Sequence, residues 1–174
     1  AEVVGYNDAL IAGEEPELCV RLRARGWKVR RLAVEMTWHD AAMTRFNQWW
    51  RRTVRAGHAF AEGATLHGAP PERHWTREAQ SNWLWGLALP ATAIAFAWPT
   101  HGASLLLFAA YLLLAWRVAG YCLRRGYARR DAWLYSLFTV VGKLPAVVGQ
   151  LQFHTNQWRG RRTRLIEYKG AAAC

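Results

Sequence analysis

Two long apolar runs stand one after the other in this 174-residue chain, and they favour a protein that inserts into a membrane. The first, residues 83–99, has no charged residue and is about 17 residues long, at the short end of what a helix needs to cross a bilayer. The second run, residues 103–123, contains one charged residue, Arg117. This arginine is close enough to the basic end of the run for its side chain to reach the interface. The connector, residues 100–102, is short and uncharged. We therefore expect a membrane hairpin whose tip lies on the outer side.

The segment after the hairpin predicts its orientation. Residues 124–130 include four arginines, and basic residues concentrate in cytoplasmic loops. Both ends of the hairpin, and with them residues 1–80, are therefore expected in the cytoplasm. The net charge of +11 and the 11 tryptophans agree with a membrane protein, because tryptophan favours the membrane–water boundary. The arginines cluster at the ends of apolar runs instead of spreading over a polar surface, so we expect no nucleic-acid partner.

A third apolar run, residues 132–153, has Lys143 and Pro145 at its centre, and both are costly in the middle of a bilayer. If this run crossed the membrane, the basic tail of residues 154–174 would lie outside, against the positive-inside rule. A re-entrant or interfacial segment satisfies both objections, and a third span remains the alternative. Residues 81–153 are thus predicted to form the membrane region.

Residues 43–62 follow a helical pattern, and the loop-like residues 63–75 complete a region that we take as 43–80. An apolar stripe with basic residues around it suits a helix that lies in the membrane interface. The alternative is an ordinary amphipathic surface helix. The stripe consists of Met43, Phe46, Trp50, Val54 and Ala61. The basic residues around it are Arg45, Arg51, Arg52 and Arg55.

Residues 1–42 resemble the end of a soluble α/β domain in their local pattern. Pro16 suits the first turn of a helix, where its missing N–H is no loss, and Gly26 is placed to end that helix. Residues 27–32 then begin with alternating apolar and polar residues, which predicts a short strand. Because the chain starts at Ala1 within what reads as a domain interior, we expect it to be a fragment.

The stretch from Gly13 to Gly26, GEEPELCVRLRARG, resembles a motif of the family 2 glycosyltransferases. The family pattern is Gly-(Glu/Asp)-Asp-x-(Asp/Glu)-Leu-x-x-Arg-Leu-x-x-x-Gly, and the match covers the acids, their spacing, Arg21 and the closing glycine. Upstream, Gly5-Tyr6 stands where the family has a Gly-Gly-Phe/Tyr turn, with Val4 in place of the first glycine.

Two further segments carry the resemblance downstream. Residues 36–40 look like the segment that returns a histidine, here His39, to the active site. Gln48-Trp49-Trp50-Arg51-Arg52 is loosely similar to the Gln-x-x-Arg-Trp motif of processive members, in a different order. The resemblance implies a fold class: an α/β remnant of a GT-A catalytic domain (residues 1–42), followed by a mainly α-helical membrane region.

The resemblance also implies roles for the acids. An inverting transfer needs a base that takes the proton of the acceptor hydroxyl as it attacks the sugar. The second acid of the motif is that base, which gives Glu15, with Glu14 as the alternative. Glu17 is expected to orient its neighbours or to pair with Arg21, four residues further along the helix.

A Mg²⁺ or Mn²⁺ cofactor would stabilise the departing diphosphate, and its main ligands, the family's DxD motif, are expected upstream of this sequence. His39 is a candidate further metal ligand or diphosphate contact, and the alternative is a structural histidine. Contacts to a phosphate or a lipid are expected from the basic helix, although anionic lipid headgroups alone would account for its charge. The residues concerned are Gln48, Trp50, Arg51, Arg52 and Arg55.

The resemblance therefore implies a multi-pass enzyme of the inner (plasma) membrane with its catalytic part in the cytoplasm. Its partners would be a nucleotide-sugar donor, a lipid-linked or glycan acceptor and membrane lipid. This piece alone is expected to be inactive. The rival interpretation is a noncatalytic membrane anchor or interaction module, in which the acids only cap a helix.

Overall fold

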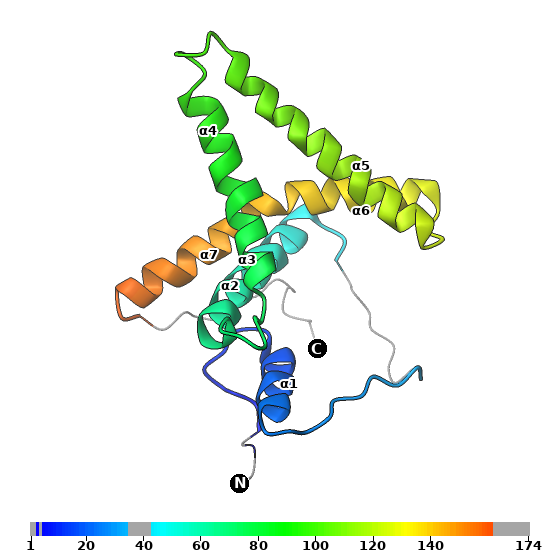
Figure 1. Cartoon of the computed structure of the whole chain (residues 1–174), viewed down its shortest axis with the longest axis vertical. Coiled ribbons are helices and arrows are strands. Elements are labelled where there is room, and N and C mark those ends of the chain that lie inside the picture. The colour runs from blue at the N-terminus through cyan, green and yellow to red at the C-terminus, as the bar shows by residue number, and fades with distance from the viewer. Residues whose placement is uncertain (1–2, 4, 35–42, 162–174) are drawn as a thin grey trace.

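The computed structural model describes residues 3, 5–34 and 43–161, and this part of the chain is built from helices joined by turns and coil (Figure 1). A short α1 lies near the end of a long α2, a hairpin projects from the centre of the molecule, and two consecutive helices cross the base of the hairpin. The helices are α1 (Glu14–Ala24), α2 (Phe46–His67), α3 (Thr76–Trp83), the π-helical η1 (Leu84–Ala88), α4 (Leu89–Ala95), the 3-10 helix η2 (Ala103–Phe108), α5 (Ala109–Arg124), α6 (Arg129–Val141) and α7 (Lys143–Trp158).

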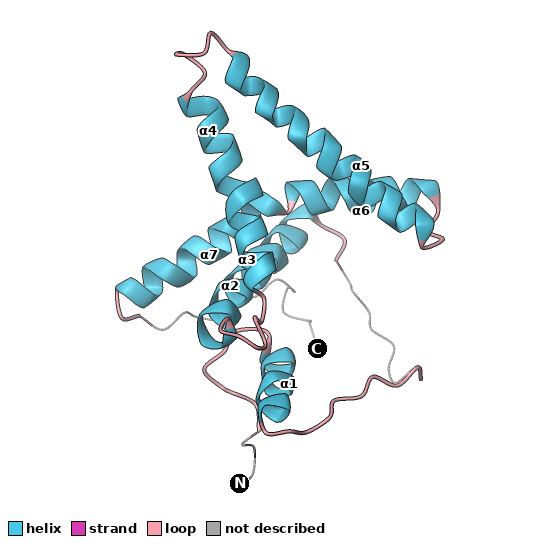
Figure 2. Cartoon of the chain, viewed as in Figure 1, coloured by secondary structure: helices cyan, strands magenta, loops and turns pink. Residues whose placement is uncertain are grey.

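The expected α/β remnant is wrong for the described part of the chain, which contains helices and no strand (Figure 2). Residues 27–32, predicted as a strand, are extended coil, and Trp27 and Leu32 are 65% and 64% exposed. A strand needs a neighbour to pair with its backbone N–H and C=O groups. No neighbouring strand is present among the residues the structure covers, so the alternating pattern does not form a sheet.

Helix α1 follows the signals in the sequence. It begins after Gly13, whose φ of 85° is a left-handed conformation that favours glycine. It ends at Ala24, and in the turn that follows Gly26 has a φ of 82° and the N–H of Trp27 donates to the carbonyl of Leu22 at 3.1 Å. The first turn holds three acids, which the positive end of the helix dipole favours.

The hairpin consists of the continuous helical run α3–η1–α4, a turn at Gly102 and the returning pair η2–α5. The Ser104 hydroxyl donates to the Ala93 carbonyl at 2.7 Å, and the Tyr111 hydroxyl donates to the Trp85 carbonyl. Large apolar side chains remain exposed along both arms, and Trp98 at the tip is 92% exposed. An apolar surface of this kind suits contact with lipid.

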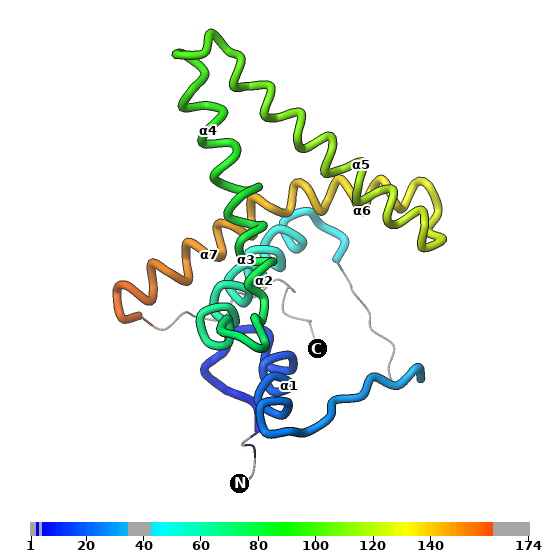
Figure 3. The backbone as a smooth tube through the Cα atoms, viewed as in Figure 1, coloured from blue at the N-terminus to red at the C-terminus, as the bar shows by residue number. Residues whose placement is uncertain are grey.

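Two helical segments are long and apolar enough to cross a membrane: Ala103–Arg124 and Arg129–Trp158. In the most apolar window of the first, only 11% is buried inside the molecule, compared with 33% in the second. Neither segment is therefore a buried core helix. Figure 3 shows that α6 and α7 run crosswise to the α4–α5 hairpin.

The tightest packing lies where α2 crosses α7, and glycines make it possible. A Cβ on Gly57 would collide with the backbone of Ala146, and one on Gly149 with the carbonyl of Val54. Gly86 of η1 meets the Lys143 carbonyl in the same way. Without a Cβ, two helix backbones can approach closely, which is the usual arrangement for helices packed in membranes.

Candidate functional site

The acidic motif forms one wall of a pocket of about 390 Å³ at the start of α1. Glu14 is half-buried and Glu15 is exposed, so both carboxylates can reach a molecule in this pocket. The opposite wall comes from the preceding loop, in which the Ala9 N–H donates to Asn7 Oδ1 at 3.1 Å. The lining residues are Tyr6, Asn7, Asp8, Leu10, Glu14 and Glu15.

Glu17 has a different environment from the other two acids. It is only 3% exposed, and Arg21 Nε donates to both of its carboxylate oxygens at 2.9 Å. His67 Nε2 lies 3.0 Å from Glu17 Oε1 and links α1 to the end of α2. With both oxygens occupied, Glu17 is placed to hold the structure together and not to accept a proton from a substrate.

Arg21 also joins the upstream turn to the motif. Its Nη2 donates to the Gly5 carbonyl at 2.7 Å. One guanidinium therefore contacts both the loop before α1 and Glu17 of α1 itself. The expected pairing of Glu17 with Arg21 is therefore present, and Gly5 and Tyr6 are held beside the acids. This connection keeps the two walls of the acidic pocket together.

A second ion pair lies next to this one, between α1 and the loop of residues 68–75. Arg23 Nη2 and Glu72 Oε2 are 2.7 Å apart. The hydrogen bond from Arg23 lowers the pKa of the Glu72 carboxyl and raises the pKa of the Arg23 guanidinium. Burial lowers the pKa of the nearby His74, and repulsion from His67 and Arg23 adds to the effect.

The predicted basic residues of α2 are not among the residues that line the acidic pocket. Arg51 and Arg52 are exposed in the first half of α2, whereas α1 contacts the end of α2 at His67. Gly13, directly before the acids, approaches α2 at Ala59, where a Cβ on the glycine would lie 3.7 Å from the alanine Cβ, and Arg51 and Arg52 lie further toward the start of the helix. Within the described part, α2 thus does not bring its arginines into the acidic pocket.

Other predicted residues of α2 have structural contacts. Gln48 Oε1 accepts the backbone N–H groups of Thr44 and Arg45 at 3.0 Å each and so caps the start of α2. Trp50 packs against Phe46, with ring centroids 6.1 Å apart. Arg55 is half-buried one turn beyond Arg51.

The metal expectations fall mostly beyond what the structure covers. His39 and the rest of segment 36–40 lie outside the described residues. Among the residues that are described, no three His, Cys, Asp or Glu side chains gather closely enough to hold a metal ion. The Mg²⁺ or Mn²⁺ ion remains a prediction.

Several residues of this region were not expected from the sequence: Asn7, Asp8 and Leu10, which line the acidic pocket, and His67 and Glu72, which fix α1 in place. His67 is 50 positions from Glu17 and Glu72 is 49 positions from Arg23, so no local pattern signals these pairs. The polar pair Asn7-Asp8 next to Tyr6 is the local signal of the pocket loop in the sequence.

Comparison with protein-family models, with curated proteins and with solved structures finds no match to this chain.

Proposed function

We propose that this chain belongs to a membrane-bound, inverting glycosyltransferase that moves a sugar from a nucleotide donor to a lipid-linked or glycan acceptor. One observation carries the proposal: Glu14 and Glu15 face a pocket while Glu17, three positions from Glu14, is locked by Arg21. A helix cap requires no such division among its acids. The proposal rests on the motif and this pocket, and not on the α/β fold expected from the resemblance.

The chemistry assigned to the pocket is proton removal. An acceptor hydroxyl bound there gives its proton to Glu15 while its oxygen forms a bond to the anomeric carbon. The bond from that carbon to the nucleotide diphosphate breaks on the opposite face, and the configuration inverts. Glu14, on the same pocket wall, is the alternative base.

The test is sugar transfer by membranes that contain the natural protein bearing this sequence, with Glu15→Gln compared with the wild type. The substitution keeps the size of the side chain and removes the base, so transfer should fall at least about a hundredfold. Glu14→Gln identifies the alternative base. Asp131→Asn, a carboxylate lost from the exposed start of α6, is the matched control. Full transfer by both glutamine variants would leave the acids as a helix cap. Transfer that is the same in membranes without the protein would favour the noncatalytic anchor.

We further propose a multi-pass arrangement with the loop between α5 and α6 in the cytoplasm. The arginines at positions 124, 125, 129 and 130 support this orientation. The pair α6 and α7 runs crosswise to the hairpin. The hairpin and this pair therefore cannot both stand perpendicular to one bilayer, which favours an interfacial course for α6 and α7. Labelling of Cys introduced at Tyr127 and at His101 tests it: a reagent that does not cross the membrane should reach only His101→Cys in intact cells.

A further inference from the structure

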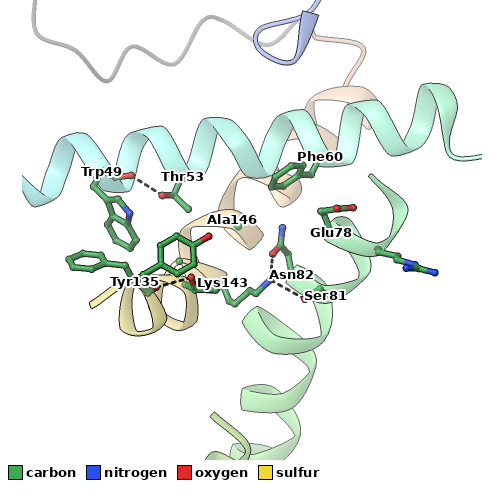
Figure 4. Close-up of a pocket in the computed structure, with 13 residues that line it drawn as sticks. Trp49, Thr53, Phe60, Glu78, Ser81, Asn82, Tyr135, Lys143 and Ala146 are labelled. Atoms are coloured by element: carbon green, nitrogen blue, oxygen red, sulfur yellow. Dashed lines mark hydrogen bonds between the residues drawn. The ribbon is translucent and has the colours of Figure 1, made fainter. Parts of the chain in front are cut away.

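A second pocket, of about 590 Å³, lies at the base of the hairpin among α2, α3, α6 and α7 (Figure 4). One part of its wall is aromatic, with Trp49 and Phe60 from α2 and Phe138 from α6. Another part is polar and comes from α3 and the start of α7. The acidic motif contributes nothing to this pocket, and the proposed glycosyltransferase function does not use it.

Lys143 is the central cation of the polar part. Its Nζ donates to Ser81 Oγ and to Asn82 Oδ1, both at 3.0 Å, as Figure 4 shows. An ammonium group has three N–H donors, so these bonds leave one more available. Lys143 is half-buried at the start of α7, where a charged group needs polar partners.

Asn82 adds a second donor. The residue is 4% exposed, and its Nδ2 has no hydrogen-bond partner among the residues that the structure describes. Lysine can only donate, so the carbonyl oxygen of Asn82 must face Lys143 and its NH₂ must point the other way. In Figure 4 that nitrogen points toward Phe60, across the pocket. Buried donors are rarely left unpaired, and this one therefore indicates a ligand with an acceptor group.

The charges of the pocket specify the sign of that ligand. Lys143 and Arg77 are positive and Glu78 is negative, so the lining has a net charge of +1. The available groups at Lys143 and Asn82 are donors, which suit a compact anion with several acceptor oxygens, such as a phosphate. A neutral sugar would leave the positive charge without a counterion.

The surroundings specify the rest of the ligand. The aromatic wall can contact an apolar chain, and the pocket opens beside helical segments that are apolar enough to cross a membrane. At the base of a membrane hairpin the phosphates of lipids lie close by. We propose that this pocket binds the phosphate headgroup of an anionic lipid, with Lys143 and Asn82 holding the phosphate and Trp49, Phe60 and Phe138 contacting the lipid chain.

The test is native mass spectrometry of the whole chain in detergent, with added lipids. Phosphatidic acid and a polyprenyl phosphate should be retained, and phosphatidylcholine should not. Preference for one of the first two tells a bilayer lipid from a lipid-linked carrier, and retention of either supports the proposal. Equal retention of phosphatidylcholine would overturn it. Displacement of phosphatidic acid by inorganic phosphate would also overturn it, because the pocket would then recognise the free anion.

Two variants tie the binding to the pocket. Lys143→Met should weaken retention of phosphatidic acid about tenfold, because it removes a charge-assisted hydrogen bond. Asn82→Asp keeps an acceptor for Lys143, and thus the local packing, but replaces the free amide donor with a negative charge, and it should abolish retention. Arg117→Met removes one positive charge from α5, outside the pocket, and should leave retention unchanged. Retention that persists in a folded Asn82→Asp variant would contradict the assignment.

Discussion

Gly13 and Trp75 are in contact where α1 packs against the end of loop 68–75. A Cβ on Gly13 would lie 2.5 Å from Trp75 Cη2, closer than real side chains approach. Trp75 in turn stacks on His74, with centroids 4.2 Å apart, and meets the ring of Phe60 edge to face at 5.2 Å. The first residue of the acidic motif thus accommodates an indole that connects α1 to α2.

We expect Gly13→Ala to loosen α1. Alanine at a φ of 85° costs about 1–2 kcal/mol, and the contact with Trp75 adds to this. A loss of about 2 kcal/mol corresponds to roughly thirtyfold faster hydrogen exchange of the α1 amides. Gly120→Ala is the control, since a Cβ there meets only the Arg124 guanidinium at 3.6 Å. Unchanged exchange in α1 would show that the contact has no energetic weight.

The buried ion pair between Glu17 and Arg21 should contribute more to the stability of the fold than the more exposed pair between Arg23 and Glu72. Glu17→Gln weakens two charge-assisted hydrogen bonds from Arg21 and the contact with His67, so we expect a loss of about 2 kcal/mol. The matched change at the surface, Glu72→Gln, should have a much smaller effect, because water screens the pair with Arg23. Thermal unfolding of both variants in detergent measures the difference, and equal shifts would refute this ranking.

The stability of this region should fall in mild acid because of His74. Burial lowers the folded-state pKa of His74 below the ordinary value of 6.5, so the unfolded chain binds this proton more tightly. Stability is therefore retained above about pH 6.5 and declines as the pH falls toward the folded-state pKa. The lowered pKa of Glu72 acts in the same direction, but only below about pH 4.5.

Unfolding midpoints measured between about pH 8 and pH 5 check this prediction. The variant His74→Gln should be less sensitive to pH in that interval than the wild type. His101→Gln, at the exposed tip of the hairpin, should keep the wild-type response. A His74→Gln variant with the same pH dependence as the wild type would exclude His74 as the responsible group.

The crossing of α2 and α7 should not tolerate even a methyl group. Gly57→Ala and Gly149→Ala each place a Cβ against the backbone of the facing helix, which cannot rotate out of the way as a side chain can. We expect a cost of about 1–3 kcal/mol for each, measured by thermal unfolding in detergent. Gly120→Ala should be neutral or slightly stabilising, because alanine is the better helix former. Tolerance at both crossing glycines would mean that the helices separate easily.

Local signals in the sequence predicted local structure well. The helix indicated by Pro16 and Gly26 is α1, and the pattern over residues 43–62 overlaps α2, which begins three residues later and runs a further turn to His67. Capping residues and apolar periodicity act within one or two turns, so they can be read without knowing the fold. The strand expected at residues 27–32 failed because a strand depends on a partner elsewhere in the chain.

By itself, the sequence determined the apolar runs, the arginine-rich connection at residues 124–130 and the spacing of the three acids on the first turn of a helix. Only the tertiary structure decided that Glu17 is buried and paired while Glu14 and Glu15 line a pocket. The contact from His67 to Glu17, for example, joins residues 50 positions apart. The same holds for Lys143 and Asn82, which are 61 positions apart and meet only because α7 crosses the base of the hairpin. Contacts of this kind depend on how whole helices pack, and packing is a property of the folded chain, which no short stretch of it specifies.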